Sequence, residues 1–183
     1  LIVTDHNSIR GALEAQKLAP ELIIIGEEIM TTKGEILAAF VKEEIPAMLT
    51  PQETITRLKE QDAFISVSHP FDFTRSGHWQ EADLLEILPD IDAIETFNAR
   101  CLLSSMNAQA EIFAHRHGIA STVGSDAHAL FELGRATLTL PHFKSAEELR
   151  QVIRQGVAET RKTGIHARVA SRYAVLRKKI IRG

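Results

Sequence analysis

Short apolar runs alternate along the chain with longer stretches in which apolar residues recur at helical spacing. The runs predict strands at residues 1–4, 21–26, 36–41, 63–68, 92–97, 119–124 and 136–140. The helical spacing predicts helices near residues 8–18, 51–61, 81–88, 103–117 and 145–155. Because strands and helices alternate, the pattern is typical of an α/β fold with a parallel sheet.

Two of the predicted helices begin at recognisable local signals. Ser145 is followed by Glu148, which is the spacing of a capping box. Thr50 precedes Pro51, and Glu53 lies in the first turn of that helix. These signals mark the starts of both helices.

Polar residues that can carry chemistry lie at or just past the carboxyl ends of the predicted strands. They are His6, Glu28, His69, Asn98, Asp126 and His128. In a βα barrel the carboxyl ends of the strands converge on one face, whereas an open sheet spreads them along an edge. Convergence therefore favours a barrel with its active site on that face.

Composition is that of an ordinary globular protein. The 183 residues are 44% hydrophobic and 25% charged, and Cys101 is the single cysteine. This excludes a disulfide scaffold and a disordered chain, and it indicates a reducing compartment. No apolar run approaches the ~20 residues of a membrane span. We therefore expect one soluble domain, located in the cytoplasm and not in a membrane.

Charge is distributed unevenly along the chain. Residues 161–183 hold eight of the 21 Lys and Arg residues and no acid, although the net charge is −3. An acidic body suits a carboxylate-rich pocket that divalent cations neutralise, but solvated surface Glu gives the same balance. The basic stretch at 161–183 is interpreted as an amphipathic helix that packs on the domain or extends from it. The alternative is a basic rim that guides a nucleotide or oligonucleotide.

The first residue, Leu1, falls inside a predicted buried strand, and no signal-peptide pattern explains this start. We therefore expect further residues upstream. A barrel usually needs ~200 residues or more, so the chain is expected to lack the first β-α unit of its barrel.

Two motifs predict metal ligands at strand ends. In GSDAH, Asp126 and His128 are two residues apart and so project to the same side of an extended chain. In SVSHPFD, His69 ends a strand because Pro70 breaks regular pairing. The structural alternatives are that Asp126 caps the next segment, that His128 is a loop residue, and that His69 is a satisfied core residue.

The segment GEEIMTTKGEI contributes further carboxylates. Glu27 and Glu28 point to opposite sides if the chain is extended, so we expect one to face the pocket and the other to be solvated. A tight hairpin at Lys33 and Gly34 would return Glu35 to the end of the Glu28 strand. Glu35 is then either a ligand or a charge that flanks the hairpin.

Asp5 and His6 are adjacent in the motif TDH. A histidine in this arrangement can bind a metal while the carboxylate orients it or a neighbouring ligand. The alternative is that Asp5 only shapes the turn into the following helix.

Taken together, the motifs TDHNSI, GEEI, SHPFD, IETFNAR and GSDAH resemble, in order and position, the PHP (polymerase and histidinol phosphatase) superfamily of metal-dependent phosphoesterases. The resemblance spans residues 1 to about 140. It implies a distorted, TIM-like βα barrel of seven strands, whose first strand is absent here together with its His-x-His motif. It also implies two or three divalent metal ions, commonly Mn, Zn or Fe.

The resemblance also implies roles for individual residues. His6 and His69 would be metal ligands, Glu28 would bridge two metals, and Asp126 and His128 would complete separate metal positions. Glu35 stands where many relatives have a histidine. A carboxylate can still ligate a metal there.

The predicted activity is metal-dependent hydrolysis of a phosphoester by a metal-activated water. The residues expected to act in the reaction are Asp5, Glu28 and Asp126, and those expected to bind the substrate are Arg75, Asn98 and Arg100. The expected substrate is a phosphorylated small molecule, a nucleotide or a single-stranded nucleic acid. Two alternatives remain, an amidohydrolase-like metal hydrolase and a non-catalytic PHP module that binds a metal or a partner.

Overall fold

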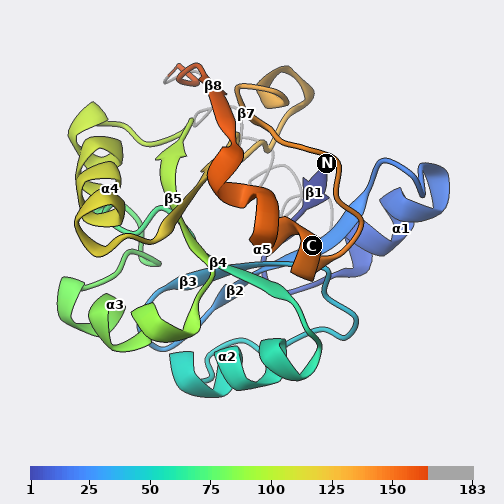
Figure 1. Cartoon of the computed structure of the whole chain (residues 1–183), viewed down its shortest axis with the longest axis horizontal. Helices are drawn as coiled ribbons and strands as arrows, with labels where there is room; N and C mark the ends of the chain where they lie inside the picture. Colours follow the sequence, from blue (N-terminus) through green and yellow to red (C-terminus); the bar gives the residue numbers. More distant parts are fainter. Residues whose placement is uncertain (165–183) are drawn as a thin grey trace, which may run out of the picture.

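The fold is that of a computed structural model, which describes residues 1–164 (Figure 1). Six strands form one sheet in sequence order: β1 (Ile2–Val3), β2 (Ile24–Met30), β3 (Glu35–Ala39), β4 (Phe64–Val67), β5 (Ala93–Asn98) and β6 (Ala120–Gly124). The α-helices are α1 (Arg10–Leu18), α2 (Pro51–Glu60), α3 (Glu81–Ile87), α4 (Ser104–His117) and α5 (Ala146–Val152). Short 3₁₀ turns follow at η1 (Leu88–Asp90), η2 (Leu130–Glu132) and η3 (Ile153–Gln155).

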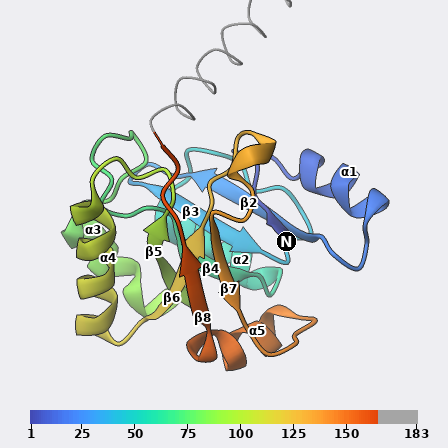
Figure 2. The ribbon, with the colours of Figure 1, turned by 90° about the horizontal axis from the view of Figure 1, so that it is seen from above.

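The α/β class is as predicted, but the seven-stranded barrel is wrong for residues 1–164. The six-stranded sheet is a curled half-barrel, and β7 (Ala136–Thr139) pairs with β8 (Val157–Thr160) in a separate antiparallel sheet. Figure 2 shows this pair beside β6. Within the larger sheet, β3 runs antiparallel to both of its neighbours, whereas the other pairs are parallel.

Two features of the chain explain the departure from a barrel. The tight turn after Met30 reverses the chain at once, so β3 returns as a hairpin partner of β2 without a helical crossover. The last described strand, β8, is exposed at all four residues, so it has no hydrophobic pattern by which it could be predicted.

The predicted helix starts are largely confirmed. The Thr50 side chain accepts from the backbone N–H of Glu53, and the Glu53 carboxylate accepts in return, which is a complete capping box. The Ser145 hydroxyl accepts from the Glu148 N–H in the same way, but the Glu148 carboxylate accepts from Lys144 instead. Each cap satisfies a backbone donor that the helix itself leaves unpaired.

The apolar core has two parts. The larger part joins α2, α3 and α4 to the sheet through side chains that are almost completely buried, among them Leu58, Ile65, Leu84, Ile94 and Phe113. The smaller part packs α5 against one end of the sheet, through Ala39, Phe64, Ala93, Ala120 and Leu149.

The position of α5 determines which end of the sheet remains available. Phe64, Ala93 and Ala120 are the first residues of β4, β5 and β6, so α5 covers the amino ends of these parallel strands. The carboxyl ends lie at the opposite side of the sheet, where the predicted site residues are found.

Two further expectations concern the ends and the environment of the chain. Within residues 1–164, no helix is both long and apolar enough to cross a membrane. The predicted helix at 161–183 lies outside the described residues apart from 161–164, which are not helical.

Candidate metal centre

The β2–β3 hairpin brings two carboxylates to the same face of the sheet. The turn closes through the Thr31 N–H, which donates to the Gly34 carbonyl, and Glu28 pairs across the strands with Leu37. Because Leu37 and Glu35 are two residues apart on β3, they share a face, and Glu35 therefore lies diagonally beside Glu28. The prediction that a hairpin returns Glu35 to Glu28 is confirmed.

Trp79 holds the tip of this hairpin. Its indole N–H donates to the Glu35 carbonyl over 3.0 Å, and its ring lies against Gly34. A Cβ at Gly34 would come within 2.4 Å of the indole nitrogen, so only glycine allows this contact. The Trp79 contact thus fixes the backbone that carries Glu35.

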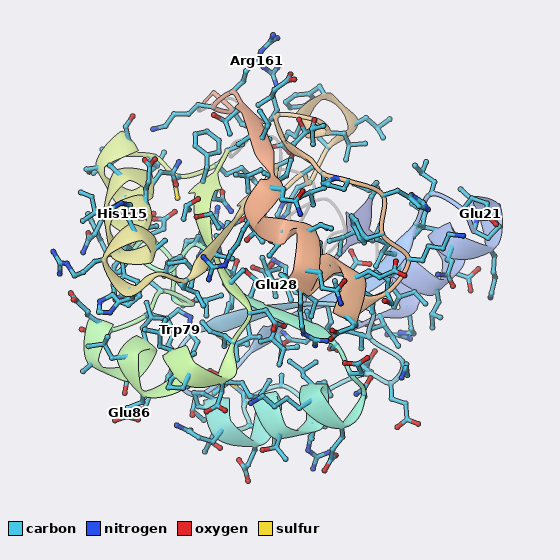
Figure 3. All side chains as sticks on the ribbon, viewed as in Figure 1. Glu21, Glu28, Trp79, Glu86, His115 and Arg161 are labelled. Atoms are coloured by element: carbon cyan, nitrogen blue, oxygen red, sulfur yellow. The ribbon has the colours of Figure 1, made fainter. Side chains whose placement is uncertain are left out.

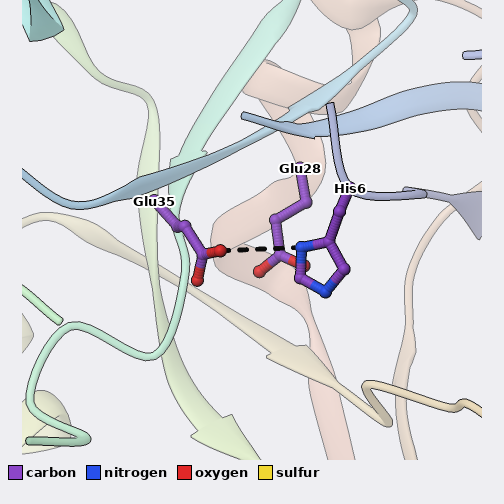
Figure 4. Close-up of side chains that lie close together, drawn as sticks. All are labelled: His6, Glu28 and Glu35. Carbon is purple, nitrogen blue, oxygen red and sulfur yellow. Dashed lines mark ion pairs between the residues drawn. The ribbon is translucent and has the colours of Figure 1, made fainter. Parts of the chain in front are cut away.

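Two histidines complete a group of four side chains, here called the Glu28 cluster: His6, Glu28, Glu35 and His69. Nδ1 of His6 lies 3.1 Å from Oε2 of Glu28 and 3.5 Å from Oε1 of Glu35 (Figure 4). Nε2 of His69 lies 3.4 Å from Oε1 of Glu28 and 3.1 Å from Oε2 of Glu35. Each carboxylate therefore faces both imidazoles.

The cluster is positioned by backbone as well as by side chains. His6 forms a parallel bridge with Glu28, which extends the pairing of β1 with β2. His69 directly follows Ser68 at the end of β4 and has a φ of 23°, a strained value for a residue with a Cβ. The Ser68 hydroxyl donates to Oε1 of Glu28 over 2.7 Å. In Figure 3, Glu28 lies in the interior of the molecule, far from the exposed Glu86 at its periphery.

The donor set fits a divalent metal ion. Ligand atoms of His6, Glu28 and Glu35 lie within 4.8 Å of one another. The His69 side chain is fully buried, and neither of its ring nitrogens makes a well-aligned hydrogen bond. Two imidazoles and two carboxylates are ligands that Mn, Zn and Fe accept. A buried imidazole without an aligned partner is the feature that a bound metal would satisfy.

Ionisation of the cluster is strongly coupled. A hydrogen bond with Glu35 raises the pKa of His6 to about 9, although burial opposes protonation. Burial also opposes protonation of His69, but the Glu28 and Glu35 carboxylates, 3.4 and 3.1 Å from Nε2, outweigh it and raise the pKa to about 10. Burial opposes ionisation of Glu35, yet the two histidines lower its pKa to about 2. Without a metal, protons supply the positive charge that the carboxylates require.

Glu95 is a buried carboxylate beneath the cluster that the sequence reasoning missed. It accepts from the His69 N–H over 2.8 Å and from Nδ2 of Asn98 over 3.0 Å. Burial raises its pKa to about 7. A Cβ at Gly124 would lie 2.0 Å from Oε1 of Glu95, so glycine leaves room for this carboxylate. An acidic residue in the interior of the strand predicted at 92–97 was the available signal.

Asp126 and His128 lie beside the Glu28 cluster, where the GSDAH motif places them. The His128 ring centroid is 6.0 Å from that of His6, and Nδ1 of His128 lies 3.4 Å from Oδ1 of Asp126. Oδ2 of Asp126 lies 2.5 Å from Nη2 of Arg75. Burial opposes ionisation of Asp126, but the Arg75 charge outweighs it and keeps the pKa low. That Asp126 and His128 bind a metal stays a prediction.

The three predicted substrate-binding residues lie in different surroundings. Arg75 contacts Asp126 and is one-fifth exposed. Asn98 is buried, and its Oδ1 accepts from the Arg100 N–H over 2.9 Å. The Arg100 side chain is 7% exposed and lies 3.3 Å from Oε1 of Glu132, which is fully buried. Of the three, Arg75 is therefore the best placed to meet a ligand.

Asp5 and Glu27 do not face the cluster. The Asp5 carbonyl accepts from the Glu28 N–H, but its carboxylate lies beside Gly11 in α1. Glu27 was expected to be solvated, and this is wrong: it is fully buried, and its Oε2 accepts from the Ile45 N–H over 3.0 Å. Because side chains alternate along a strand, Glu27 points away from the cluster, as predicted. Both faces of β2 are covered, however, so Glu27 does not reach solvent. Its burial raises its pKa to about 7.

Comparison with known proteins finds one family model that matches part of the chain. Residues 105–158, from α4 to β8, match the PHP-associated family. This match is consistent with the resemblance to the PHP superfamily that the sequence motifs carry.

Two curated relatives come from Methanocaldococcus jannaschii. The uncharacterized protein MJ0417 is 37% identical over 137 residues, which cover 73% of this chain and 54% of that protein. The uncharacterized protein MJ1587 is 43% identical over 101 residues, which cover 53% of this chain and 56% of that protein. The chain thus spans about half the length of the curated relatives it matches.

Two solved structures share the fold. PsfC from Pseudomonas syringae PB-5123 has a TM-score of 0.57 at 16% identity, over 85% of this chain and 65% of that one. A protein from Bifidobacterium adolescentis ATCC 15703, named as a candidate metal-dependent phosphoesterase, has a TM-score of 0.56 at 15% identity. That match covers 70% of this chain and 77% of that one. At such identities the likeness describes the fold alone.

Proposed function

We propose that the protein is a metal-dependent phosphoesterase and that the Glu28 cluster is its metal centre. The observation that carries this proposal is the position of the Glu28 carboxylate, whose two oxygens face imidazoles that follow two different strands, β1 and β4. The name of the Bifidobacterium neighbour and the PHP-associated match support the same class of reaction.

The residues of the cluster would hold divalent ions, for which Mn, Zn and Fe are the expected metals. Two or three ions are expected if Asp126 and His128 bind as well. When bound, such ions lower the pKa of a water molecule and offset the negative charge on a phosphoryl group. Glu28 would join neighbouring ions through its two oxygens, and His6 and His69 would each supply a nitrogen.

Hydrogen bonds with neighbouring residues hold the proposed ligands in place. Ser68 fixes one oxygen of Glu28, and Glu95 fixes the backbone of His69. Such partners commonly change metal affinity or activity by about 10- to 100-fold when they are removed. The chain thus supplies an oriented donor set as well as the donors themselves.

Phosphate recognition requires a cation that faces the metal centre. Arg75 supplies one, because its guanidinium contacts Asp126 beside the cluster and its charge opposes protonation of His69. A guanidinium can donate to two phosphate oxygens at once. The substrate class we propose is a phosphorylated small molecule or a nucleotide, with a single-stranded nucleic acid as the larger alternative.

The neighbouring glutamates of β2 provide a matched test. Both are buried, but Glu28 faces the cluster and Glu27 faces Ile45. After loading with Mn²⁺, phosphate release from a panel of nucleotides, sugar phosphates and oligonucleotides is measured for the wild type, Glu28→Gln and Glu27→Gln. We expect Glu28→Gln to lose on the order of 100-fold or more in rate and Glu27→Gln to retain it.

Three outcomes would count against the proposal. Equal rates for Glu28→Gln and the wild type would refute the role of Glu28. Turnover of amides or lactones without phosphate release would indicate an amidohydrolase-like enzyme instead. Metal binding without any hydrolysis across the panel would indicate a module that binds a metal or a partner.

A further inference from the structure

A single closed loop links His69 to the tip of the β2–β3 hairpin. It comprises residues 69–80, here called the 69–80 loop, and it lies between β4 and α3. The Trp79 N–H donates to the Pro70 carbonyl over 2.8 Å, so the two ends of the loop are fastened together. The Trp79 side chain is buried in the larger part of the apolar core. The loop is therefore anchored at the end that is further from His69 in the sequence.

The 69–80 loop binds the backbone of Glu35 on both sides. The Glu35 N–H donates to the Gly77 carbonyl over 3.0 Å. The Glu35 carbonyl accepts from the Trp79 indole over 3.0 Å and from the Ser68 N–H over 3.2 Å. Because Glu35 is the first residue of β3, these hydrogen bonds fix the strand at the point where it leaves the turn.

The Glu35 side chain packs against the same loop. A Cβ at Gly77 would lie 2.2 Å from Oε2, 2.4 Å from Cδ and 2.6 Å from Cγ of Glu35. Among the described glycines, Gly118 and Gly134 have a positive φ, so the backbone of Gly77 would accept alanine and it is space that is lacking. The Glu35 carboxylate thus fills the place of a side chain at Gly77, with Oε2 directed at Nε2 of His69 over 3.1 Å.

These contacts are not those of a charge that only flanks a hairpin. Such a carboxylate would be more stable in water, because burial of a charge is costly unless it is paired. The Glu35 side chain is instead 7% exposed and faces the imidazoles of His6 and His69. The 69–80 loop therefore holds Glu35 in an orientation that its charge alone would not favour.

We propose that Gly77 and Trp79 are positioning residues that commit Glu35 to the metal centre as a ligand. Trp79 fixes the backbone of Glu35, and Gly77 leaves the space that the carboxylate occupies. This role rests on the proposed metal centre and extends it, because it decides between the ligand and the hairpin charge that the sequence leaves open for Glu35. One loop would then place two of the ligands, His69 and Glu35.

Mn²⁺ affinity, measured by isothermal titration of the full chain, tests this role without reference to catalysis. We expect Glu35→Ala to weaken Mn²⁺ binding by about tenfold or more, and Gly77→Ala and Trp79→Phe to do so as well. Gly156→Ala is the matched control. Its Cβ would lie 2.7 Å from Leu138, which packs on the smaller part of the core, so it should leave the affinity unchanged.

A double-mutant cycle separates positioning from a general loss of structure. Glu35→Ala removes Oε2, Cδ and Cγ, which are the atoms that a Cβ at Gly77 would meet. In the Glu35→Ala background, Gly77→Ala and Trp79→Phe should therefore weaken Mn²⁺ binding no further. Circular dichroism establishes that each variant is folded, and Trp79→Phe carries the test if Gly77→Ala does not fold.

Two results would overturn the proposal. One is a folded Glu35→Ala variant that binds Mn²⁺ as tightly as the wild type, because Glu35 would then not be a ligand. The other is a Trp79→Phe variant that loses no affinity, or loses as much in the Glu35→Ala background as in the wild type. Failure of the proposed function has different signatures. A wild type that binds no Mn²⁺ refutes the metal centre and this role with it, whereas Mn²⁺ binding without phosphate release refutes the activity alone.

Discussion

The ion pair of Arg100 with Glu132 predicts a large loss of stability when the arginine alone is removed. The two side chains are 7% and 0% exposed, and Nε lies 3.3 Å from Oε1. Arg100→Met retains an apolar stem but leaves the Glu132 carboxylate without this cation. Breaking a buried pair in this way costs about 3–5 kcal/mol. For a domain of this size, that loss lowers Tm by roughly 10 °C.

Two comparisons separate this effect from an ordinary charge deletion. Arg116 and Glu81 form an exposed pair at 4.0 Å, so Arg116→Met should cost less than about 1 kcal/mol. The double variant Arg100→Met/Glu132→Gln should recover most of the loss, because the remaining amide carries no buried charge. Urea unfolding and thermal melts measure all three variants.

Loss of the Arg100–Glu132 ion pair should also have a local effect at His128. Its Oε2 accepts from the His128 N–H over 2.9 Å, so hydrogen exchange of His128 should quicken in Arg100→Met. If Arg100→Met costs no more than Arg116→Met, the pair is not structural, and Arg100 returns to the expected role of a substrate ligand.

Two further predictions concern the metal centre. Gly124→Ala places a Cβ 2.0 Å from Oε1 of Glu95 and should displace this carboxylate. We expect the displacement to lower Tm and to weaken Mn²⁺ binding by about tenfold or more. Unchanged Mn²⁺ binding in isothermal titration would refute the positioning role of Glu95. In the metal-free protein, the pKa values of His6 and His69 are raised from 6.5 to about 9 and about 10, so their stabilising effect is complete below pH 6.5 and is lost as pH rises through 9 to 10. The urea midpoint in EDTA should therefore fall over that range, and a midpoint that rises there would contradict the assignment.

Local features of the fold could be predicted because they depend on neighbouring residues. The capping residues Thr50 and Ser145 act within one helical turn, and the Lys33–Gly34 turn is a property of a few residues. Whether the sheet closes into a barrel could not be predicted from neighbouring residues, because closure depends on which strands distant in the sequence pair with each other. β8 pairs with β7, but all four of its residues are exposed, so no hydrophobic pattern predicts this strand.

In the site, too, features that depend on neighbouring residues could be predicted, and features that depend on distant partners could not. Strand-end positions identified His6, Glu28 and His69, which the fold brings together. Strand alternation separated Glu27 from Glu28 but could not show that both faces of β2 are covered. The partner of Arg100 is 32 residues further along the chain, so no local pattern could distinguish a substrate ligand from half of a buried ion pair.

The most direct test of the account is the anomalous scattering of crystals grown with Mn²⁺. We expect a Mn²⁺ peak within about 2.0–2.3 Å of a Glu28 oxygen and of a nitrogen of His6 or His69. A Mn²⁺ peak bound by Asp126 and His128, with none at Glu28, would contradict the proposed metal centre.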